Sequence, residues 1–235
     1  MLRSLAAAAL TAAALLLLQS AATAAVYQDW LVQPPTTAVT LEPWSSESES
    51  GPSGLTLSNG LISRRFALVG SDSWATWDFI SHLEDSGDTS LLRSLTPESV
   101  VTLDGKAYPV GGLVPAACSG GSGSCKAKGQ PGQPGAFFNR SVAVKPDPDA
   151  FRYVSHRTAA PTAPFAWKPG SRGSPPDAQW PPHGLHLEID FAAPLNASGT
   201  PVVGVGITVH YEMYVGHPVL TKWVSVSTQR IPTAT

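Results

Sequence analysis

The stretch Leu185–Phe191, which reads LHLEIDF, decides the fold class of this chain. Its odd-numbered residues are apolar and its even-numbered residues are polar. Successive side chains of a strand point to opposite faces of the sheet, so this alternation is typical of a strand with one buried face and one face in water. Residues 205–214 repeat the pattern, and 219–226 continue it after the turn Gly216-His217-Pro218. Consecutive strands with short connections indicate an antiparallel sheet.

Two further strand pairs are predicted by the turn residues between them. Asn59-Gly60 precedes the apolar-rich run 61–68, and Asp104-Gly105 separates residues 99–103 from 106–110. Both dipeptides accept the positive φ angles of a type I′ turn and are therefore strong hairpin signals. With one more strand at 151–156, the sequence predicts an all-β protein built as an antiparallel β-sandwich.

The 235 residues are predicted to fall into three parts. Residues 1–24 are predicted to be a signal peptide, and 25–53, with their Ser/Glu run, a linker. Residues 54–235 are predicted to form the sandwich domain, interrupted at about 114–182 by a loop-rich insertion. The insertion is rich in Gly, Ser and Pro, and such composition buries too little apolar surface to form a core of its own.

The signal peptide is predicted from three features in order. Arg3 supplies a positive charge, an apolar run extends from Leu5 to Leu18, and Ala22-Thr23-Ala24 forms a cleavage site after Ala24. The alternative, an uncleaved membrane anchor, needs about twenty apolar residues, and polar residues end the run earlier. We therefore expect export to the secretory lumen or the extracellular space, with no membrane span after cleavage.

Composition and single residues agree with export. The net charge is −2 and no basic cluster occurs, so nucleic acid is not an expected partner. Cys118 and Cys125, the only two cysteines, are predicted to form a disulfide in an oxidising compartment. Asn139 and Asn196 lie in glycosylation sequons, which a eukaryotic host would place on the surface.

The chain contains no motif that predicts a cofactor or a catalytic centre. No Gly-rich phosphate loop or G-x-S-x-G elbow occurs. The six histidines are expected not to form a metal site, since even His183 and His186 would point to opposite faces of a strand. Glu188, Asp190 and Glu212 are expected to be solvated on the polar faces of their strands, so they indicate no catalytic carboxylate pair.

The tryptophans provide the candidates for ligand contact. Trp167 and Trp180 lie in Pro/Gly/Ser-rich segments, where an exposed ring can stack on the apolar face of a sugar or contact a protein partner. The alternative is that both rings cap loop ends against the sandwich. Trp223 lies within a predicted strand and is expected to fill the core.

Four segments carry a resemblance to a known family: 57–66 (LSNGLISRRF), 75–78 (ATWD), 103–113 (LDGKAYPVGGL) and 209–224. Together they resemble the N-terminal β-sandwich, or supersandwich, of α-galactosidase-type glycoside hydrolases. The resemblance implies a sandwich that packs on a (β/α)8 catalytic barrel, and it implies Trp77 and Asp78 as carbohydrate contacts. The sequence given ends at Thr235, directly after the last predicted strand, so no catalytic residue is carried over.

Three hypotheses follow for the function. The first is a secreted, non-catalytic N-terminal sandwich of a glycoside hydrolase-like protein, whose partners would be carbohydrates such as galactosides and a catalytic barrel absent from this chain. The second is a stand-alone carbohydrate-binding or cell-surface module. The third, an autonomous enzyme, would need a catalytic pair within the sandwich, and the sequence identifies none.

Overall fold

The computed structural model describes residues 29–46, 52–84, 87–92, 95–116, 143–168, 170, 173 and 177–228. The chain divides into a first unit, Met1–Gln33, and a second unit, Pro34–Thr235. In the first unit, residues 29–33 form a turn in which Asp29 O accepts hydrogen bonds from the backbone of Val32 and Gln33. All strands of the described residues belong to the second unit. In the described part of the chain, no helix is long and apolar enough to cross a membrane.

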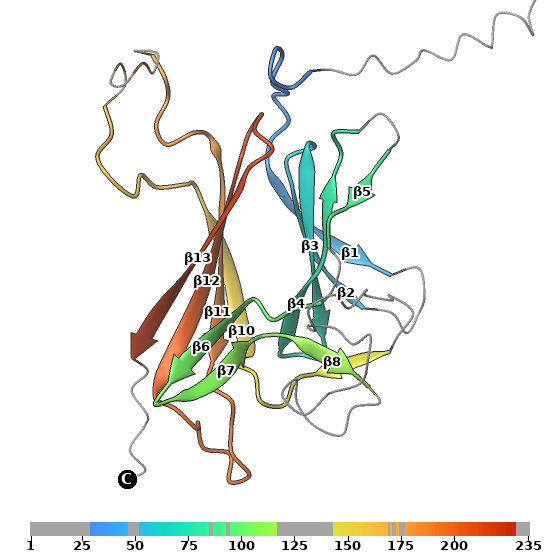
Figure 1. The fold of residues 1–235 in the computed structure, drawn as a ribbon, viewed down its shortest axis with the longest axis vertical. Coiled ribbons are helices and arrows are strands. Elements are labelled where there is room, and N and C mark those ends of the chain that lie inside the picture. Colours follow the sequence, from blue (N-terminus) through green and yellow to red (C-terminus); the bar gives the residue numbers. More distant parts are fainter. Residues whose placement is uncertain are drawn as a thin grey trace, which may run out of the picture. The chain divides into compact units, whose positions relative to one another are not determined.

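The first of two large sheets contains five antiparallel strands in sequential order (Figure 1). They are β1 (Thr40–Ser45), β2 (Ser53–Ser58), β3 (Ile62–Val69), β4 (Ser73–Ser81) and β5 (Thr89–Ser90). Strand β1 lies in the segment predicted to be a linker, which corrects that prediction. It forms because Trp44 packs against Trp77 and donates its Nε1 hydrogen to Phe66 O. Pro43 is tolerated because β1 is an edge strand.

The second sheet contains the three strands that the alternating stretches predict, together with the strand predicted at 151–156. They are β10 (Arg152–Ala159), β11 (Gly184–Ala192), β12 (Val205–Tyr214) and β13 (Leu220–Thr228), again antiparallel and in sequential order. Two smaller antiparallel pairs accompany the large sheets in the described part of the chain. One is the hairpin of β6 (Ser99–Leu103) and β7 (Lys106–Val110), and the other pairs β8 (Leu113–Pro115) with β9 (Val144–Pro146). The predicted fold class, all-β and antiparallel, is confirmed.

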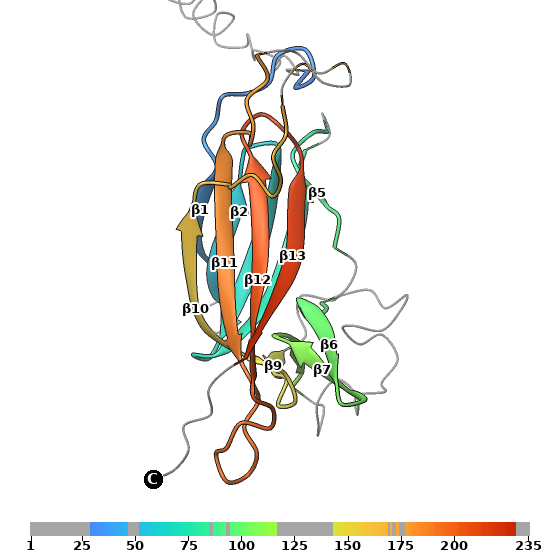
Figure 2. The same cartoon turned by 90° about the vertical axis from the view of Figure 1, so that its left-hand side faces the viewer.

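The two large sheets share one hydrophobic core. Phe66 and Trp74 of the first sheet and Tyr211 of the second are at most 1% exposed, and the ring centroids of Phe66 and Tyr211 lie 5.2 Å apart. The apolar residues of LHLEIDF (Leu187, Ile189 and Phe191) point into this core, as their alternation predicts. Figures 1 and 2 show the same arrangement from two sides, with β10–β13 lying over the first sheet.

A smaller core covers the opposite face of the first sheet. Here Ala67, Ala75 and Trp77 pack with Leu95, which lies between β5 and β6, and with Leu113 of β8. Both faces of the first sheet are therefore buried along β4, whose burial pattern shows hardly any alternation. This arrangement explains why β4 lacks the amphipathic pattern that identifies β11 and β12.

The two predicted turns differ. Asp104 and Gly105 have φ angles of 51° and 78°, and Leu103 pairs with Lys106, so the two-residue turn is confirmed. The Asn59-Gly60 connection is longer, because the last paired residues are Ser58 and Ser63. Asn59 Oδ1 accepts hydrogen bonds from the backbone of Leu61 and Ile62, each at 3.0 Å. This side-chain bonding replaces the predicted type I′ turn.

Candidate functional site

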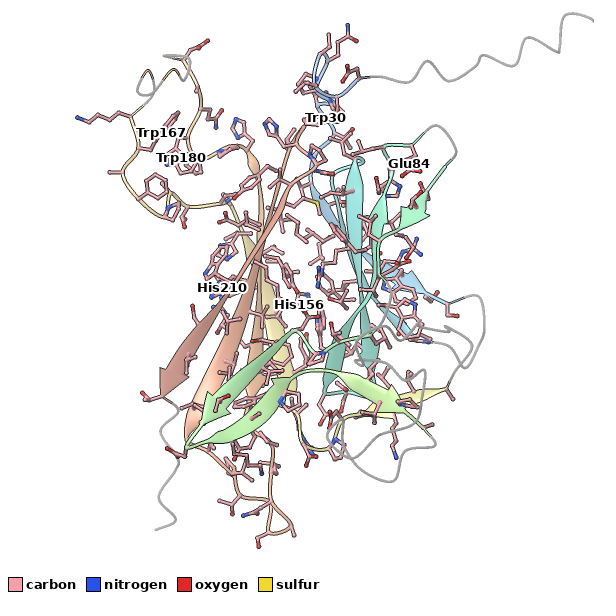
Figure 3. All side chains as sticks on the ribbon, viewed as in Figure 1. Trp30, Glu84, His156, Trp167, Trp180 and His210 are labelled. Carbon is pink, nitrogen blue, oxygen red and sulfur yellow. The ribbon has the colours of Figure 1, made fainter. Side chains whose placement is uncertain are left out.

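The two loop tryptophans come together in the structure. They lie on the connection between β10 and β11, and their ring centroids are 5.4 Å apart (Figure 3). Phe165 joins them at 5.3 Å from Trp180, and Trp180 Nε1 donates a hydrogen bond to Phe165 O at 3.4 Å. We call Phe165, Trp167 and Trp180 the aromatic group.

The rings of the aromatic group are accessible from outside. Phe165 is 58% exposed, and both tryptophans are partly exposed. Two polar residues are near Trp180 in the sequence: Gln179 precedes it and His183 follows it by three positions, and Gln179 Nε2 lies 3.2 Å from His183 Nδ1. An exposed set of rings beside hydrogen-bonding groups can stack on the C–H face of a sugar and bind its hydroxyl groups.

Trp77 and Asp78 have a different environment from the one that the resemblance implies. Trp77 is 8% exposed and belongs to the smaller core, where its ring lies 6.3 Å from that of Trp44. Asp78 is 2% exposed, and its Oδ1 accepts hydrogen bonds from Ser90 Oγ at 2.6 Å and from the Phe79 amide at 2.9 Å. Both side chains are occupied in packing β4, so neither offers a ring face or a carboxylate edge to a sugar.

Several other predicted positions fall outside the described residues. These are Ala24 at the cleavage site, Cys118 and Cys125, and Asn139. Asn196 is described and lies exposed in the turn between β11 and β12. Its Oδ1 accepts hydrogen bonds from the amides of Ser198 at 2.9 Å and Thr200 at 3.0 Å.

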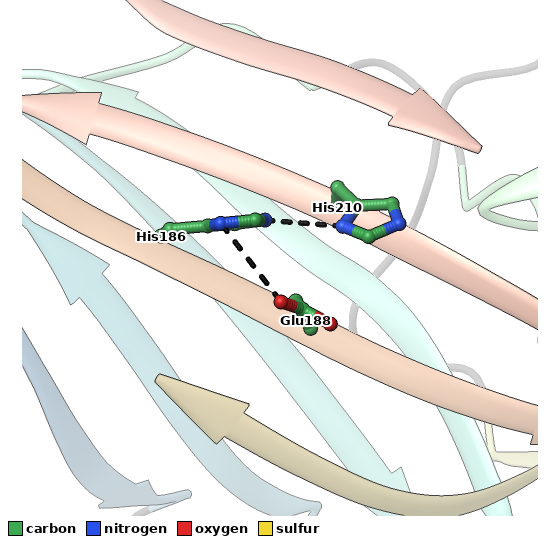
Figure 4. A group of neighbouring side chains, drawn as sticks. All are labelled: His186, Glu188 and His210. Atoms are coloured by element: carbon green, nitrogen blue, oxygen red, sulfur yellow. Dashed lines mark hydrogen bonds and ion pairs between the residues drawn. The ribbon is translucent and has the colours of Figure 1, made fainter. Parts of the chain in front are cut away.

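A second group of side chains, missed by the sequence reasoning, lies on the outer face of the second sheet. His186, Glu188 and His210 each offer a potential metal-binding atom, and these atoms lie within 4.8 Å of one another. His186 Nε2 and His210 Nδ1 share a hydrogen bond of 3.0 Å, and His186 Nδ1 lies 3.9 Å from Glu188 Oε1 (Figure 4). We call these three residues the histidine group. The prediction that the histidines do not cluster is therefore wrong.

Strand register produces the histidine group. His186 and Glu188 are two positions apart on β11 and point to one face. Glu188 lies directly opposite His210 on β12, so His186 and His210 are diagonal neighbours. The spacing of the histidines along the sequence does not predict this contact. It could be predicted only from the pairing of the two strands, because His186 and His210 lie on the polar faces of β11 and β12.

Neighbouring side chains hold the histidine group in place. His210 Nε2 bonds to Ser225 Oγ at 3.0 Å, and the Trp223 ring stacks on the His210 ring at 4.8 Å and 2°. Trp223 is 40% exposed, so the prediction that it fills the core is wrong. Arg157 donates hydrogen bonds to Glu188 Oε2 and to Asp190 Oδ2. These two carboxylates are thus paired with a guanidinium as well as being partly in water.

Burial lowers the pKa of His210 below its ordinary value, and the nearby His186 and Arg157 lower it further. Glu188 and Asp190 act in the opposite direction but do not outweigh these effects. The His210 imidazole is therefore neutral at physiological pH and has a lone pair available.

A third polar group is enclosed between the sheets. Glu98 is fully buried, and its carboxylate accepts hydrogen bonds from Thr76 Oγ1 at 2.8 Å, Lys222 Nζ at 2.9 Å and the Tyr211 hydroxyl. The Arg64 guanidinium lies 3.7 Å from the same carboxylate. Burial opposes ionisation of Glu98, but the two cations and these hydrogen bonds outweigh it and lower its pKa. A carboxylate whose pKa is lowered by two cations is a poor proton acceptor, so Glu98 is unsuited to general base catalysis. Its ion pairs and hydrogen bonds point to a role in stabilising the fold.

No protein-family model, no curated protein and no solved structure matches this chain significantly.

Proposed function

We propose that this chain is a secreted carbohydrate-binding β-sandwich, the non-catalytic part of a glycoside hydrolase-like protein, and that the aromatic group is its sugar-contact surface. The carrying observation is that Trp167 and Trp180 stand 5.4 Å apart, with Phe165 exposed beside them. Residues separated by a turn-rich segment are thereby brought into one apolar surface.

The polar groups of the described residues favour binding over catalysis. Glu98 is sealed in the core with two cations, and Glu188 and Asp190 are paired with Arg157. Glycoside hydrolysis needs one carboxyl group that donates a proton and a second that attacks or activates water. None of these three carboxylates is arranged as such a pair, which supports a non-catalytic role for this part of the protein.

The alternative is a stand-alone carbohydrate-binding or cell-surface module. The aromatic group would bind the sugar in this case too. The two proposals therefore assume the same ligand, and only the first assumes a catalytic barrel as a partner. Galactosides are the sugars that the resemblance favours. We take the stacking of one ring on a sugar as comparable to a pair of aromatic side chains, which contributes about 0.5–1.5 kcal/mol.

Binding of galacto-oligosaccharides by the full chain, followed by tryptophan fluorescence and calorimetry, tests the proposal. We expect W167A and W180A each to raise the Kd about two- to tenfold, the equivalent of one stacking contact. The matched control is W223A, which removes an exposed tryptophan that lies on β13, outside the aromatic group. No binding to any sugar on a glycan array, or equal binding by W167A, W180A and W223A, would overturn the proposal.

A further inference from the structure

We propose that the histidine group on the outer face of β11 and β12 is a binding site for a divalent transition-metal ion of the zinc class, with His186 Nε2, His210 Nδ1 and one oxygen of Glu188 as ligands. This site is independent of the aromatic group, which lies on the connection between β10 and β11.

The distances match the requirements of such an ion. Two nitrogens that bind one tetrahedral Zn²⁺ at about 2.0–2.1 Å are separated by about 3.3 Å. His186 Nε2 and His210 Nδ1 already lie 3.0 Å apart. Each residue of the histidine group offers one potential ligand atom, and these atoms lie within 4.8 Å of one another. Small side-chain rotations therefore suffice to bring them around an ion, while the strand backbones stay paired.

The proton shared by His186 Nε2 and His210 Nδ1 can move to His186 Nδ1 when a metal ion binds. If His210 Nε2–H donates to Ser225 Oγ, then His186 Nε2–H donates to His210 Nδ1 in the metal-free protein. Metal binding at both nitrogens requires that this proton move to His186 Nδ1. That atom lies 3.9 Å from Glu212 Oε1, so a carboxylate stabilises the new tautomer and no net proton is released.

Outer contacts orient all three ligands. Ser225 holds His210 through its far nitrogen, and Arg157 holds Glu188 through Oε2, which leaves Oε1 on the side of His186. His186 is only 7% exposed and is flanked by the Trp223 ring, at 5.1 Å between centroids. Fixed partners of this kind are typical of metal ligands, and replacing one costs about 10- to 100-fold in affinity.

The donor set also selects the ion. Imidazole nitrogens favour zinc, copper and nickel, whereas Ca²⁺ and Mg²⁺ favour sites built from oxygen atoms. Three protein ligands leave a fourth position open to water or to a donor group from a ligand. We therefore expect Cu²⁺ to bind more tightly than Zn²⁺, and Ca²⁺ not to compete with either.

The test is calorimetric titration of the full chain with ZnCl₂, after purification without a polyhistidine tag and treatment with a chelator. We expect saturable binding of one ion per chain. H186A, H210A and E188Q should each raise the Kd about 100-fold or more, and S225A about tenfold. The matched control is H217A, because His217 is exposed and lies outside the histidine group. H217A should bind as the wild type does.

Folding is monitored separately, by circular dichroism and thermal melting in the presence of chelator. E188Q keeps the volume of the side chain, so it remains informative if H186A fails to fold. Three results would each overturn the proposal: no saturable Zn²⁺ binding by the wild type, unchanged binding by E188Q and H210A when both are folded, or displacement of Zn²⁺ by an equal concentration of Ca²⁺.

Discussion

Lys222 Nζ donates a hydrogen bond of 2.9 Å to the carboxylate of Glu98, a residue 124 positions away in sequence. Glu98 lies just before the β6–β7 hairpin and Lys222 lies on β13, so the bond ties the connecting chain to the last strand of the second sheet. Arg64 on β3 reaches the same carboxylate at 3.7 Å. One buried anion thereby joins three parts of the fold that have no common strand pairing.

Replacing Glu98 with glutamine is expected to destabilise the protein by about 3 kcal/mol. E98Q keeps the shape of the side chain but leaves Lys222 and Arg64 without their anion, and breaking a buried ion pair typically costs about 3–5 kcal/mol. We expect the lower end because both cations keep some contact with water. Urea denaturation measures the loss, with E42Q on the exposed edge strand as the control. Equal stability of E98Q and the wild type would show that the pairing is energetically neutral.

The stability difference between the wild type and E98Q is expected to shrink in acid. The folded protein lowers the pKa of Glu98 below its ordinary value of 4.5. The ionised form is therefore favoured by folding, and its contribution is complete above that value and lost as the pH falls through the lower folded-state pKa. Unfolding free energies of both proteins, measured from neutral pH to about pH 3, test this sign. A difference that stays constant over this range would contradict it.

Asn59 is a second long-range connection, and replacing it with aspartate is expected to cost about 2–4 kcal/mol. Asn59 is fully buried, and its Nδ2 donates to Tyr214 O at 2.8 Å and to His217 O at 2.7 Å. In N59D a carboxylate oxygen would face both carbonyls, and each buried group left without its hydrogen bond costs about 1–3 kcal/mol.

N196D provides the matched control for N59D. The Asn196 side chain also accepts two backbone hydrogen bonds through Oδ1, but it is exposed, and aspartate preserves those bonds. Thermal melting of the two variants should therefore show a large loss for N59D and little change for N196D. Similar melting temperatures for N59D and the wild type would refute the role of Asn59 as a connector between turns.

Local pattern was sufficient for β11 and β12, because the alternation in 185–191 and 205–214 reports directly which side chains are buried. It was insufficient for β1 and β4. Strand β1 depends on Trp44 packing against Trp77 of β4 and bonding to Phe66 O of β3, and neither strand is its direct neighbour in the sheet. Strand β4 is covered on both faces, which removes the alternation.

The contacts between polar side chains were even harder to predict from local sequence pattern. The sequence places Lys222 on the apolar face of its strand together with Leu220 and Val224, and a charge on that face was a usable signal for a buried partner. Nothing local identifies Glu98 as that partner. His186 and His210 likewise meet only through the register of β11 and β12. The contact between Trp167 and Trp180 depends on the path of the loop. The composition of the surrounding segments predicted only that each tryptophan, taken singly, could contact a ligand.

Expression in a eukaryotic secretory host is expected to modify Asn196, and this result would test export directly. The sequon Asn196-Ala197-Ser198 lies in an exposed turn, where the modifying enzyme has access to the side chain. The secreted protein should lose mass on treatment with an N-glycosidase, and a glycopeptide containing Asn196 should be found by mass spectrometry. N196Q should abolish that glycopeptide while N139Q leaves it intact. A secreted wild-type chain that carries no sugar at Asn196 would contradict the prediction, and a chain retained in the cytosol would contradict export itself.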